Sequence, residues 1–286
     1  MNVLVTGAAG YVGSIVTEEL IKQGSSVVAL DNLQQGHREA VAPEATFVQA
    51  NVGDLCQLDE VFRRHRIQVV MHLAAESAVG YSMTDPARYF KSNVVYGMDL
   101  LNVMVKHGVQ MLVFSSTAAV YGEPAQLPIK ESSAVNPLNA YGESKLVFEK
   151  ILLWYGKAYG LRFISLRYFN AAGATERFGE DHRPETHLIP NVLKVALGQA
   201  ERVPIFGGDY PTKDGTCVRD YIHVADIAKA HVLALRNLQE GKCNKVYNLG
   251  NNRGYSVMEV CRQLEKLQVL QYLWSSIRDV QEIQQS

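Results

Sequence analysis

A glycine-rich turn near the start of the chain constrains the fold more than any other feature. An apolar run at residues 3–6 ends in Gly7, and a helical pattern follows from Val12 to Gln23. Gly7, Gly10 and Gly13 give a G-x-x-G-x-x-G spacing at this junction. Glycines placed so permit a tight turn, close approach of a pyrophosphate and close helix–strand packing. The pattern indicates a dinucleotide site at the helix N-terminus, although a purely structural glycine-rich turn has the same spacing.

Apolar and helical segments continue to alternate after this junction. A second apolar run, Val27–Leu30, ends at Asp31 and completes a strand–turn–helix–strand unit. Further strands are expected at 46–48, 69–73, 112–114 and 163–166, and helices at 58–65, 86–107 and 140–159. This alternation predicts the α/β class, with a doubly wound parallel sheet of Rossmann type covered on both faces.

Glycine and proline become denser after about residue 170, which indicates a second lobe of short helices and loops. We therefore expect an NAD-binding domain at residues 1–170 and a smaller substrate-binding lobe at residues 171–286. No internal repeat or low-complexity linker separates the two parts.

Composition narrows the classes of partner. The chain carries 28 Lys and Arg against 29 Asp and Glu, without a basic run, so neither nucleic acid nor an anionic membrane is expected. No signal peptide or membrane span is recognised, and a cytoplasmic location is expected. The four cysteines form no C-x-x-C motif and are accompanied by no histidine cluster, so no metal site is expected. They are Cys56, Cys217, Cys243 and Cys261.

Asp31 strengthens the dinucleotide interpretation. It stands at the end of the second predicted strand, where a carboxylate accepts hydrogen bonds from the adenosine ribose and repels a 2′-phosphate. This favours NAD over NADP. A solvated aspartate at a strand end is the alternative interpretation.

A second motif carries the chemistry. Tyr141 and Lys145 form Y-x-x-x-K at the start of a predicted helix, so their side chains share one face. A neighbouring ammonium is expected to lower the tyrosine pKa and make the phenol a base near neutral pH. Ser115, Ser116 and Thr117 end an apolar strand upstream and offer a hydroxyl to the substrate and the tyrosine. The motif alone is common by chance; it becomes specific behind the glycine-rich turn.

These features together resemble the extended short-chain dehydrogenase/reductase family, and within it the UDP-glucose 4-epimerases. The resemblance runs from residue 1 to about residue 266 and rests on residues 5–13, 31–33, 115–122, 166–170, 209–212 and 218–224. Thr117 is followed by Ala118 and Ala119, where the sugar-nucleotide dehydratases of the family carry Asp-Glu, which argues against dehydration.

The resemblance implies NAD-dependent epimerisation at C4 of a UDP-hexose, UDP-galactose to UDP-glucose, through a transient 4-keto sugar. The implied catalytic residues are Thr117, Tyr141 and Lys145. The implied cofactor contacts are Gly7, Gly10, Tyr11, Val12, Gly13, Asp31, Asn32, Gly36, Asn51, Val52, Leu73, Ala74, Ala75, Ser77, Asn93, Tyr141, Lys145 and Tyr168. The implied substrate contacts are Thr117, Tyr141, Asn170, Leu188, Phe206 and Arg219.

Three of these positions need comment. Asn51 stands where the family usually has Asp, and it keeps a side-chain acceptor. Ser77 stands where some members have a Lys that contacts a phosphate. Arg219 suits a diphosphate because its guanidinium forms bidentate bonds, although a surface ion pair with Asp220 is the alternative. The resemblance also implies a homodimer formed through two long helices, here residues 86–107 and 140–159; packing of their apolar side chains on the sheet is the alternative.

The tail from about residue 267 departs from the family, which continues with a Pro-Arg-Arg-Pro-Gly-Asp segment that gives the diphosphate a second arginine. Shifting the reading frame of residues 267–285 by one nucleotide restores that segment with suitable synonymous codons. We therefore expect a frameshift product, with a divergent functional tail as the alternative. Two other functions stay open at this point: a truncated NAD-binding homologue with little or no activity, and a related UDP-glucuronate or UDP-pentose 4-epimerase.

Overall fold

The computed structural model describes residues 1–264, which divide into two compact units. Unit 1 contains residues 1–179 and 222–250, and unit 2 contains residues 180–221 and the segment that begins at Asn251. The predicted boundary at residue 170 divides the chain into two continuous parts, whereas each observed unit is made of two separate segments of the chain. Residues 222–250 return to the first unit because they supply it with a helix and a sheet strand.

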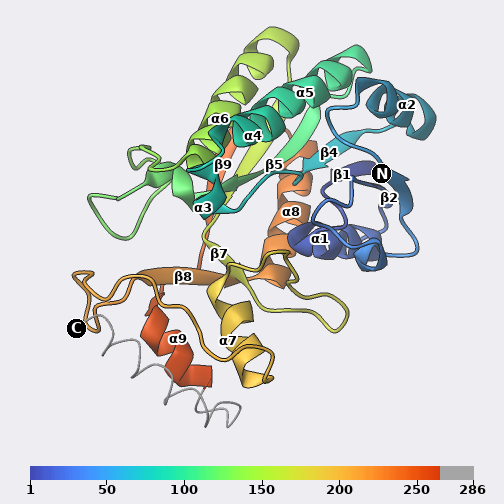
Figure 1. Ribbon diagram of the computed structural model, residues 1–286. Coiled ribbons are helices and arrows are strands. Elements are labelled where there is room, and N and C mark those ends of the chain that lie inside the picture. The colour runs from blue at the N-terminus through green and yellow to red at the C-terminus, as the bar shows by residue number, and fades with distance from the viewer. Residues whose placement is uncertain (265–286) are drawn as a thin grey trace. The chain divides into compact units, whose positions relative to one another are not determined.

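In the described residues, unit 1 contains a parallel sheet of seven strands in the order β3-β2-β1-β4-β5-β6-β9 (Figure 1). The strands of this sheet are β1 (Asn2–Thr6), β2 (Ser26–Asp31), β3 (Thr46–Gln49), β4 (Val69–His72), β5 (Met111–Thr117), β6 (Arg162–Tyr168) and β9 (Lys245–Leu249). The short strand β7 (Asn170–Ala172) follows β6 and is not part of this sheet. The helices are α1 (Tyr11–Lys22), α2 (Leu55–His65), α3 (Val79–Ser82), α4 (Pro86–Phe90), α5 (Tyr96–Lys106), α6 (Ala140–Tyr159) and α8 (Val224–Gln239). Single turns of other helix types lie at Arg38–Ala40, Lys91–Val95 and Ala118–Tyr121.

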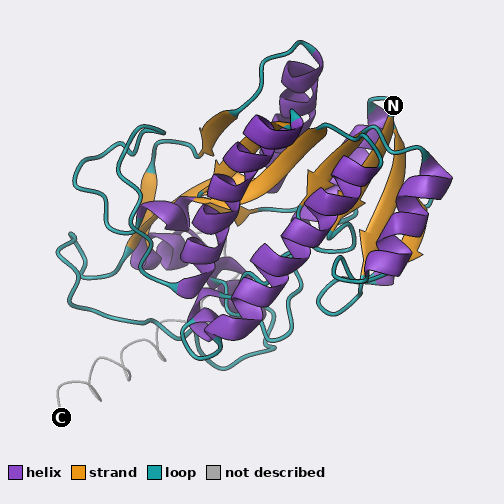
Figure 2. Cartoon of the chain, turned by 90° about the horizontal axis from the view of Figure 1, so that it is seen from above, coloured by secondary structure: helices purple, strands orange, loops and turns teal. Residues whose placement is uncertain are grey.

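Helices cover both faces of this sheet, as Figure 2 shows. Successive strand residues point to opposite faces, so each face has its own core. Val3 of β1 belongs to the core that contains Leu20 of α1 and Ile227 of α8. Leu4, the next residue, belongs to the core that contains Phe148 of α6 and residues of α2 and α5. Burial on both faces explains why the strands read as continuous apolar runs.

The expected fold class is therefore confirmed, with each predicted strand lying within or next to an observed one. The predicted helix at 86–107 is instead α4 and α5 joined by a π-helical turn. Asn93 lies in this turn and is buried. Its side-chain amide forms hydrogen bonds with Glu76 and Ser144, so the regular helix is interrupted here. The sequence interpretation missed α8 and β9, which complete the sheet and its cover.

Unit 2 is smaller. It holds α7 (Leu188–Ala196), most of β8 (Val218–His223), β10 (Gly254–Ser256) and α9 (Val257–Leu264). Strand β10 pairs antiparallel with β8, with Tyr255 opposite Arg219. The predicted frameshift from residue 267 lies outside the described residues. No helix within residues 1–264 is long and apolar enough to cross a membrane.

Two buried histidines make the stability of unit 1 depend on pH. Burial lowers the pKa of His72 to about 3 and that of His231 to about 4. An unfolded histidine titrates near pH 6.5, so below that pH the unfolded chain binds more protons. We expect the free energy of unfolding to fall by about 1.4 kcal/mol per pH unit for each histidine between pH 6.5 and 4. Urea unfolding measures this slope, and His231→Gln should reduce it. An unchanged slope in that variant would contradict the prediction.

Candidate active site

The glycine-rich turn brings the ends of β1 and β4 together. Gly7 has φ = 72°, and a Cβ at this position would lie 2.6 Å from the backbone N of Ala74. A Cβ at Gly13 would lie 1.9 Å from the carbonyl oxygen of Gly7. Both positions therefore require glycine. From β1 the chain continues to β2 on one side of the sheet, and from β4 it continues to β5 on the other side, so the strand order reverses between β1 and β4. Doubly wound sheets bind ligands at such a point.

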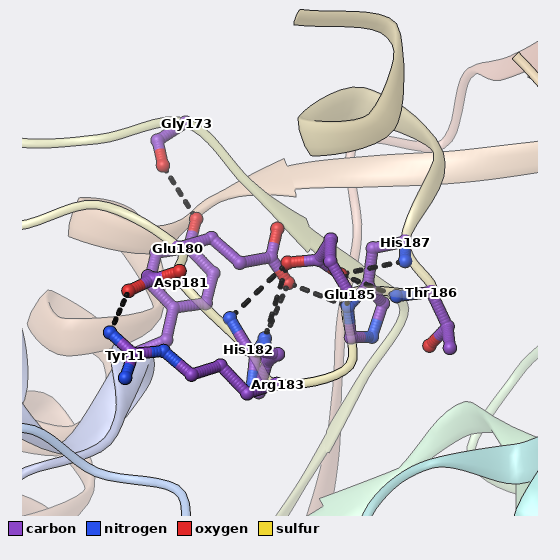
Figure 3. Close-up of polar contacts among 9 residues, drawn as sticks. All are labelled: Tyr11, Gly173, Glu180, Asp181, His182, Arg183, Glu185, Thr186 and His187. Carbon is purple, nitrogen blue, oxygen red and sulfur yellow. Dashed lines mark hydrogen bonds and ion pairs between the residues drawn. The ribbon is translucent and has the colours of Figure 1, made fainter. Parts of the chain in front are cut away.

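The turn fits a dinucleotide phosphate. Helix α1 begins directly after it, and its N-cap is Gly10, which has no side chain to occupy the helix end. First-turn N–H groups have no partner within the helix and attract anions. The hydroxyl of Tyr11 donates to the carbonyl of Gly173 at 2.6 Å, which fixes this side chain beside the turn (Figure 3).

Asp31 is buried, so the alternative of a solvated strand-end aspartate is excluded. Its Oδ2 accepts from the N–H of Ala9 at 2.9 Å, and its Oδ1 accepts from the N–H of Leu33 at 2.8 Å. The carboxylate thus joins the glycine-rich turn to the loop after β2. A carboxylate offers about four acceptor positions, which leaves room for ribose hydroxyls.

We expect Asp31→Asn to weaken NAD binding roughly tenfold or more. The amide group can accept only one of the two N–H bonds, and the charge that excludes a 2′-phosphate is lost. Calorimetric titration with NAD and NADP measures both effects, and the ratio of the NAD affinity to the NADP affinity should fall. Asp226→Asn, which alters an exposed carboxylate on α8, is the control. Unchanged NAD affinity in Asp31→Asn would contradict this role.

The end of β5 and the start of α6 hold the expected catalytic residues. Asn139 caps α6 by accepting from the N–H of Gly142 at 2.8 Å, which starts the helix beside Tyr141. Lys145 is buried and donates from Nζ to the carbonyl of Ser115 at 2.8 Å. Its Nζ lies 6.0 Å from the centre of the Tyr141 ring. Thr117 ends β5 and hydrogen-bonds Tyr141 through its hydroxyl. The structure therefore brings Thr117, Tyr141 and Lys145 together.

The electrostatics differ from the expectation that Lys145 activates the tyrosine. Burial raises the pKa of Tyr141 to about 12, and only the hydrogen bond with Thr117 lowers it. Burial also lowers the pKa of Lys145 to about 7, against the charge of Glu149, which raises it. Desolvation penalises both charged forms, so the protein alone does not make Tyr141 a base at neutral pH.

A buried ion pair behind the site was not anticipated from the sequence. Glu149 lies one helical turn after Lys145, and its carboxylate accepts from Arg167 at 3.0 and 2.5 Å. Ser116 donates to the same carboxylate at 2.5 Å, and Arg167 also donates to the hydroxyl of Tyr121 at 2.7 Å. The pair connects α6 with β5 and β6. The spacing of Lys145 and Glu149 was the only sequence signal for it.

The other expected cofactor residues of unit 1 lie at the carboxyl ends of the strands or in the loops that follow them. Asn51 accepts from the N–H of Gly53 at 2.8 Å and lines an open pocket with Tyr96. Leu73 donates its N–H to the carbonyl of Thr6 at 3.1 Å. Gly36 approaches the backbone of Ala9 so closely that a Cβ would lie at 2.8 Å. Asn32 and Ser77 are exposed, Val12, Ala74 and Ala75 are partly buried, and Val52 is buried.

Two expected contacts have protein partners. Asn93 holds the loop after β4 against α6 through Glu76 and Ser144. The hydroxyl of Tyr168 lies 2.9 Å from Nε2 of His231, and burial raises its pKa. Both arrangements support the walls of the site, and their direct contact with a cofactor stays a prediction.

The expected substrate residues are divided between the two units. Asn170 starts β7 in unit 1. Leu188 starts α7, Phe206 is 80% exposed, and Arg219 lies on β8, all in unit 2. The guanidinium of Arg219 donates to the carbonyl of Val218 at 3.0 Å. Their roles in substrate binding stay predictions.

The comparison with known proteins agrees with the geometry described for unit 1. The model of the NAD dependent epimerase/dehydratase family matches residues 3–250. The chain belongs to this family. An epimerase/dehydratase relative, UDP-glucose 4-epimerase of Halalkalibacterium halodurans, is 52% identical over 92% of this chain and 80% of its own length.

Solved structures of family members have the same fold. UDP-glucose 4-epimerase from Brucella ovis in complex with NAD has a TM-score of 0.90 at 44% identity, over 93% of this chain and 82% of that one. The enzyme from Bifidobacterium longum in complex with NAD⁺ and UDP has a TM-score of 0.89 at 39% identity, over 93% and 83%.

Proposed function

We propose that this chain interconverts UDP-galactose and UDP-glucose by NAD-dependent epimerisation at C4. The observation that carries the proposal is the grouping of Thr117, Tyr141 and Lys145 in the same unit as a dinucleotide cradle. The names of the relatives, and the solved relative that binds NAD⁺ and UDP, support the same reaction.

NAD, when bound, supplies a hydride acceptor that later returns the hydride. Tyr141 takes the proton of the sugar 4-hydroxyl as C4 is oxidised, and gives it back after the 4-keto sugar has turned over. Thr117, whose hydroxyl interacts with Tyr141 and lowers its pKa, would position the phenol toward that hydroxyl. Lys145, anchored on the carbonyl of Ser115, would hold a nicotinamide ribose. Tyr141 would lose its proton more readily beside the positive charge of a bound nicotinamide.

The expected contacts of the nucleotide sugar are Asn170, Leu188, Phe206 and Arg219. Arg219 is exposed and therefore accessible to a diphosphate. An assay of the 286-residue protein with NAD and UDP-galactose tests the proposal. UDP-glucuronate and a UDP-pentose serve as competing substrates. Faster turnover of either would favour the related 4-epimerases, and NAD binding without any turnover would favour an inactive homologue.

We also propose a homodimer formed through α5 and α6. The two helices lie side by side, joined by the bond from the Tyr155 hydroxyl to Asn102 at 2.6 Å. Apolar side chains are exposed on both, and apolar patches of this kind mark interfaces. They are Met98 and Val105 on α5 and Leu153, Trp154 and Tyr159 on α6. Light scattering of Trp154→Glu tests the dimer, which this charge should dissociate.

The cytoplasmic location expected from the sequence stays a prediction that cell fractionation tests.

A further inference from the structure

Two glutamates and two histidines converge in unit 2, on the segment before α7. Glu180, His182, Glu185 and His187 each offer one ligand atom, and these atoms lie within 4.8 Å of one another. Figure 3 shows the four side chains turned toward a common centre. Among the described residues 1–264, this is the group of His, Cys, Asp and Glu side chains placed to hold a metal ion.

The nitrogen–oxygen separations suit one tetrahedral ion. His187 Nδ1 lies 2.9 Å from Glu180 Oε1 and 2.8 Å from Glu185 Oε1. His182 Nδ1 lies 3.3 Å from Glu180 Oε1 and 3.8 Å from Glu185 Oε2. Ligand atoms at about 2.0–2.2 Å from zinc, placed at tetrahedral corners, lie about 3.3–3.5 Å from one another. The observed separations bracket these values, so small side-chain rotations would complete the coordination.

A second observation points to a ligand at the same place. His182 Nδ1 is buried and lies within ion-pair distance of Glu180 and Glu185, yet it completes no hydrogen bond with either. A buried nitrogen left without a hydrogen bond is costly and rare in proteins. This nitrogen lies beside both carboxylates, where a metal ion would take it as a ligand.

The carboxylates are buried and held in place. The side chain of Glu185 is 2% exposed and that of Glu180 is 9% exposed. Oε1 of Glu185 accepts the N–H groups of Thr186 and His187, each at 2.8 Å. Backbone bonds of this kind orient a ligating carboxylate. Two buried carboxylates at one place also attract positive charge.

We propose that Glu180, His182, Glu185 and His187 bind one divalent transition-metal ion, preferably zinc. Imidazole nitrogens and carboxylate oxygens are suitable zinc ligands, and four protein ligands leave no open position for a substrate. The site is therefore structural, and the ion fixes residues 180–187 at the start of α7. The proposal does not depend on the epimerase reaction.

Metal titration of the full 286-residue protein, stripped with a chelator and with its thiols alkylated, tests the site. We expect one equivalent of Zn²⁺ by calorimetry. We also expect Co²⁺ to bind one to one, with the intense visible absorption of tetrahedral coordination. Glu185→Gln and His182→Ala should each weaken Zn²⁺ binding about tenfold or more. Glu176→Gln and His65→Ala, which alter a carboxylate and an imidazole outside the cluster, should keep the wild-type affinity.

Several outcomes would overturn the proposal. The stripped wild-type protein would bind no stoichiometric Zn²⁺, Co²⁺ would show only the weak absorption of octahedral coordination, or the cluster variants would bind as the controls do. Circular dichroism and NAD binding, which depends on unit 1, check that each variant is folded. The wild-type titrations decide the question even if the variants do not fold.

Discussion

Tyr141→Phe is expected to lower kcat for UDP-galactose epimerisation by about 10²–10⁴-fold, the usual contribution of a positioned acid–base group. The variant keeps the ring and loses only the hydroxyl that exchanges a proton with the sugar 4-hydroxyl. Its KM for UDP-galactose and its NAD content should change little, because the hydroxyl acts in the transition state rather than in holding the ground state. Steady-state assays with measured NAD occupancy separate these quantities.

Tyr247→Phe is the matched control for this experiment. It removes the same hydroxyl from an exposed tyrosine on β9, outside the site and outside the proposed dimer surface. We expect wild-type kcat in that variant. If Tyr141→Phe kept more than about a tenth of the wild-type kcat, Tyr141 would not be the acid–base group. The reaction would then need another proton acceptor, and Thr117 is the hydroxyl next to the phenol.

The pH dependence of the site follows from the two perturbed groups. In the protein without bound ligands, Lys145 loses its proton near pH 7 and Tyr141 near pH 12, because burial disfavours both charges. Sequence spacing placed the two side chains on one helix face, but it could not predict their pKa values. Those values depend on how much water reaches each group, which the surrounding tertiary structure decides.

The sequence predicted the first half of the fold because that half follows local rules. Close backbone contact explains the turn at Gly7 and Gly13, and burial on both faces explains the apolar runs of β1, β2, β4, β5 and β6. Residues 222–250 were misplaced because membership of the sheet depends on pairing between β9 and β6, whose residues are distant in sequence. Density of glycine and proline gave no sign of that pairing.

The proposed metal ligands show a different limit. Glu180, His182, Glu185 and His187 lie within one short segment, yet their spacing matches no familiar zinc motif. The loop brings the four side chains together, and the sequence alone gave no reason to expect that geometry. The expectation of no metal site rests on the cysteines alone, which form no C-x-x-C motif and have no histidine cluster beside them.

Arg167→Met is expected to lower the free energy of unfolding by about 3–5 kcal/mol. The side chains of Arg167 and Glu149 are 6% and 7% exposed, so removing the guanidinium leaves a buried carboxylate without its cation. Ser116 remains as a hydrogen-bond donor to that carboxylate, but one neutral hydroxyl does not replace a bidentate ion pair. Equilibrium unfolding in urea measures the loss. Arg64→Met, which breaks an exposed pair with Glu60 on α2, should have only a small effect.

The double variant Glu149→Leu with Arg167→Met distinguishes the cost of an unpaired charge from the loss of packing. Replacing both partners by apolar side chains removes the buried charge, so the double variant should be more stable than Arg167→Met alone. If it were less stable, the pair would stabilise the fold through packing and hydrogen bonds with Ser116 and Tyr121. Because Glu149 raises the pKa of Lys145, the double variant should also lower that pKa further. A lower pKa of Lys145 in the double variant would show that Glu149 stabilises the charged form of Lys145, in addition to connecting α6 with the sheet through Arg167.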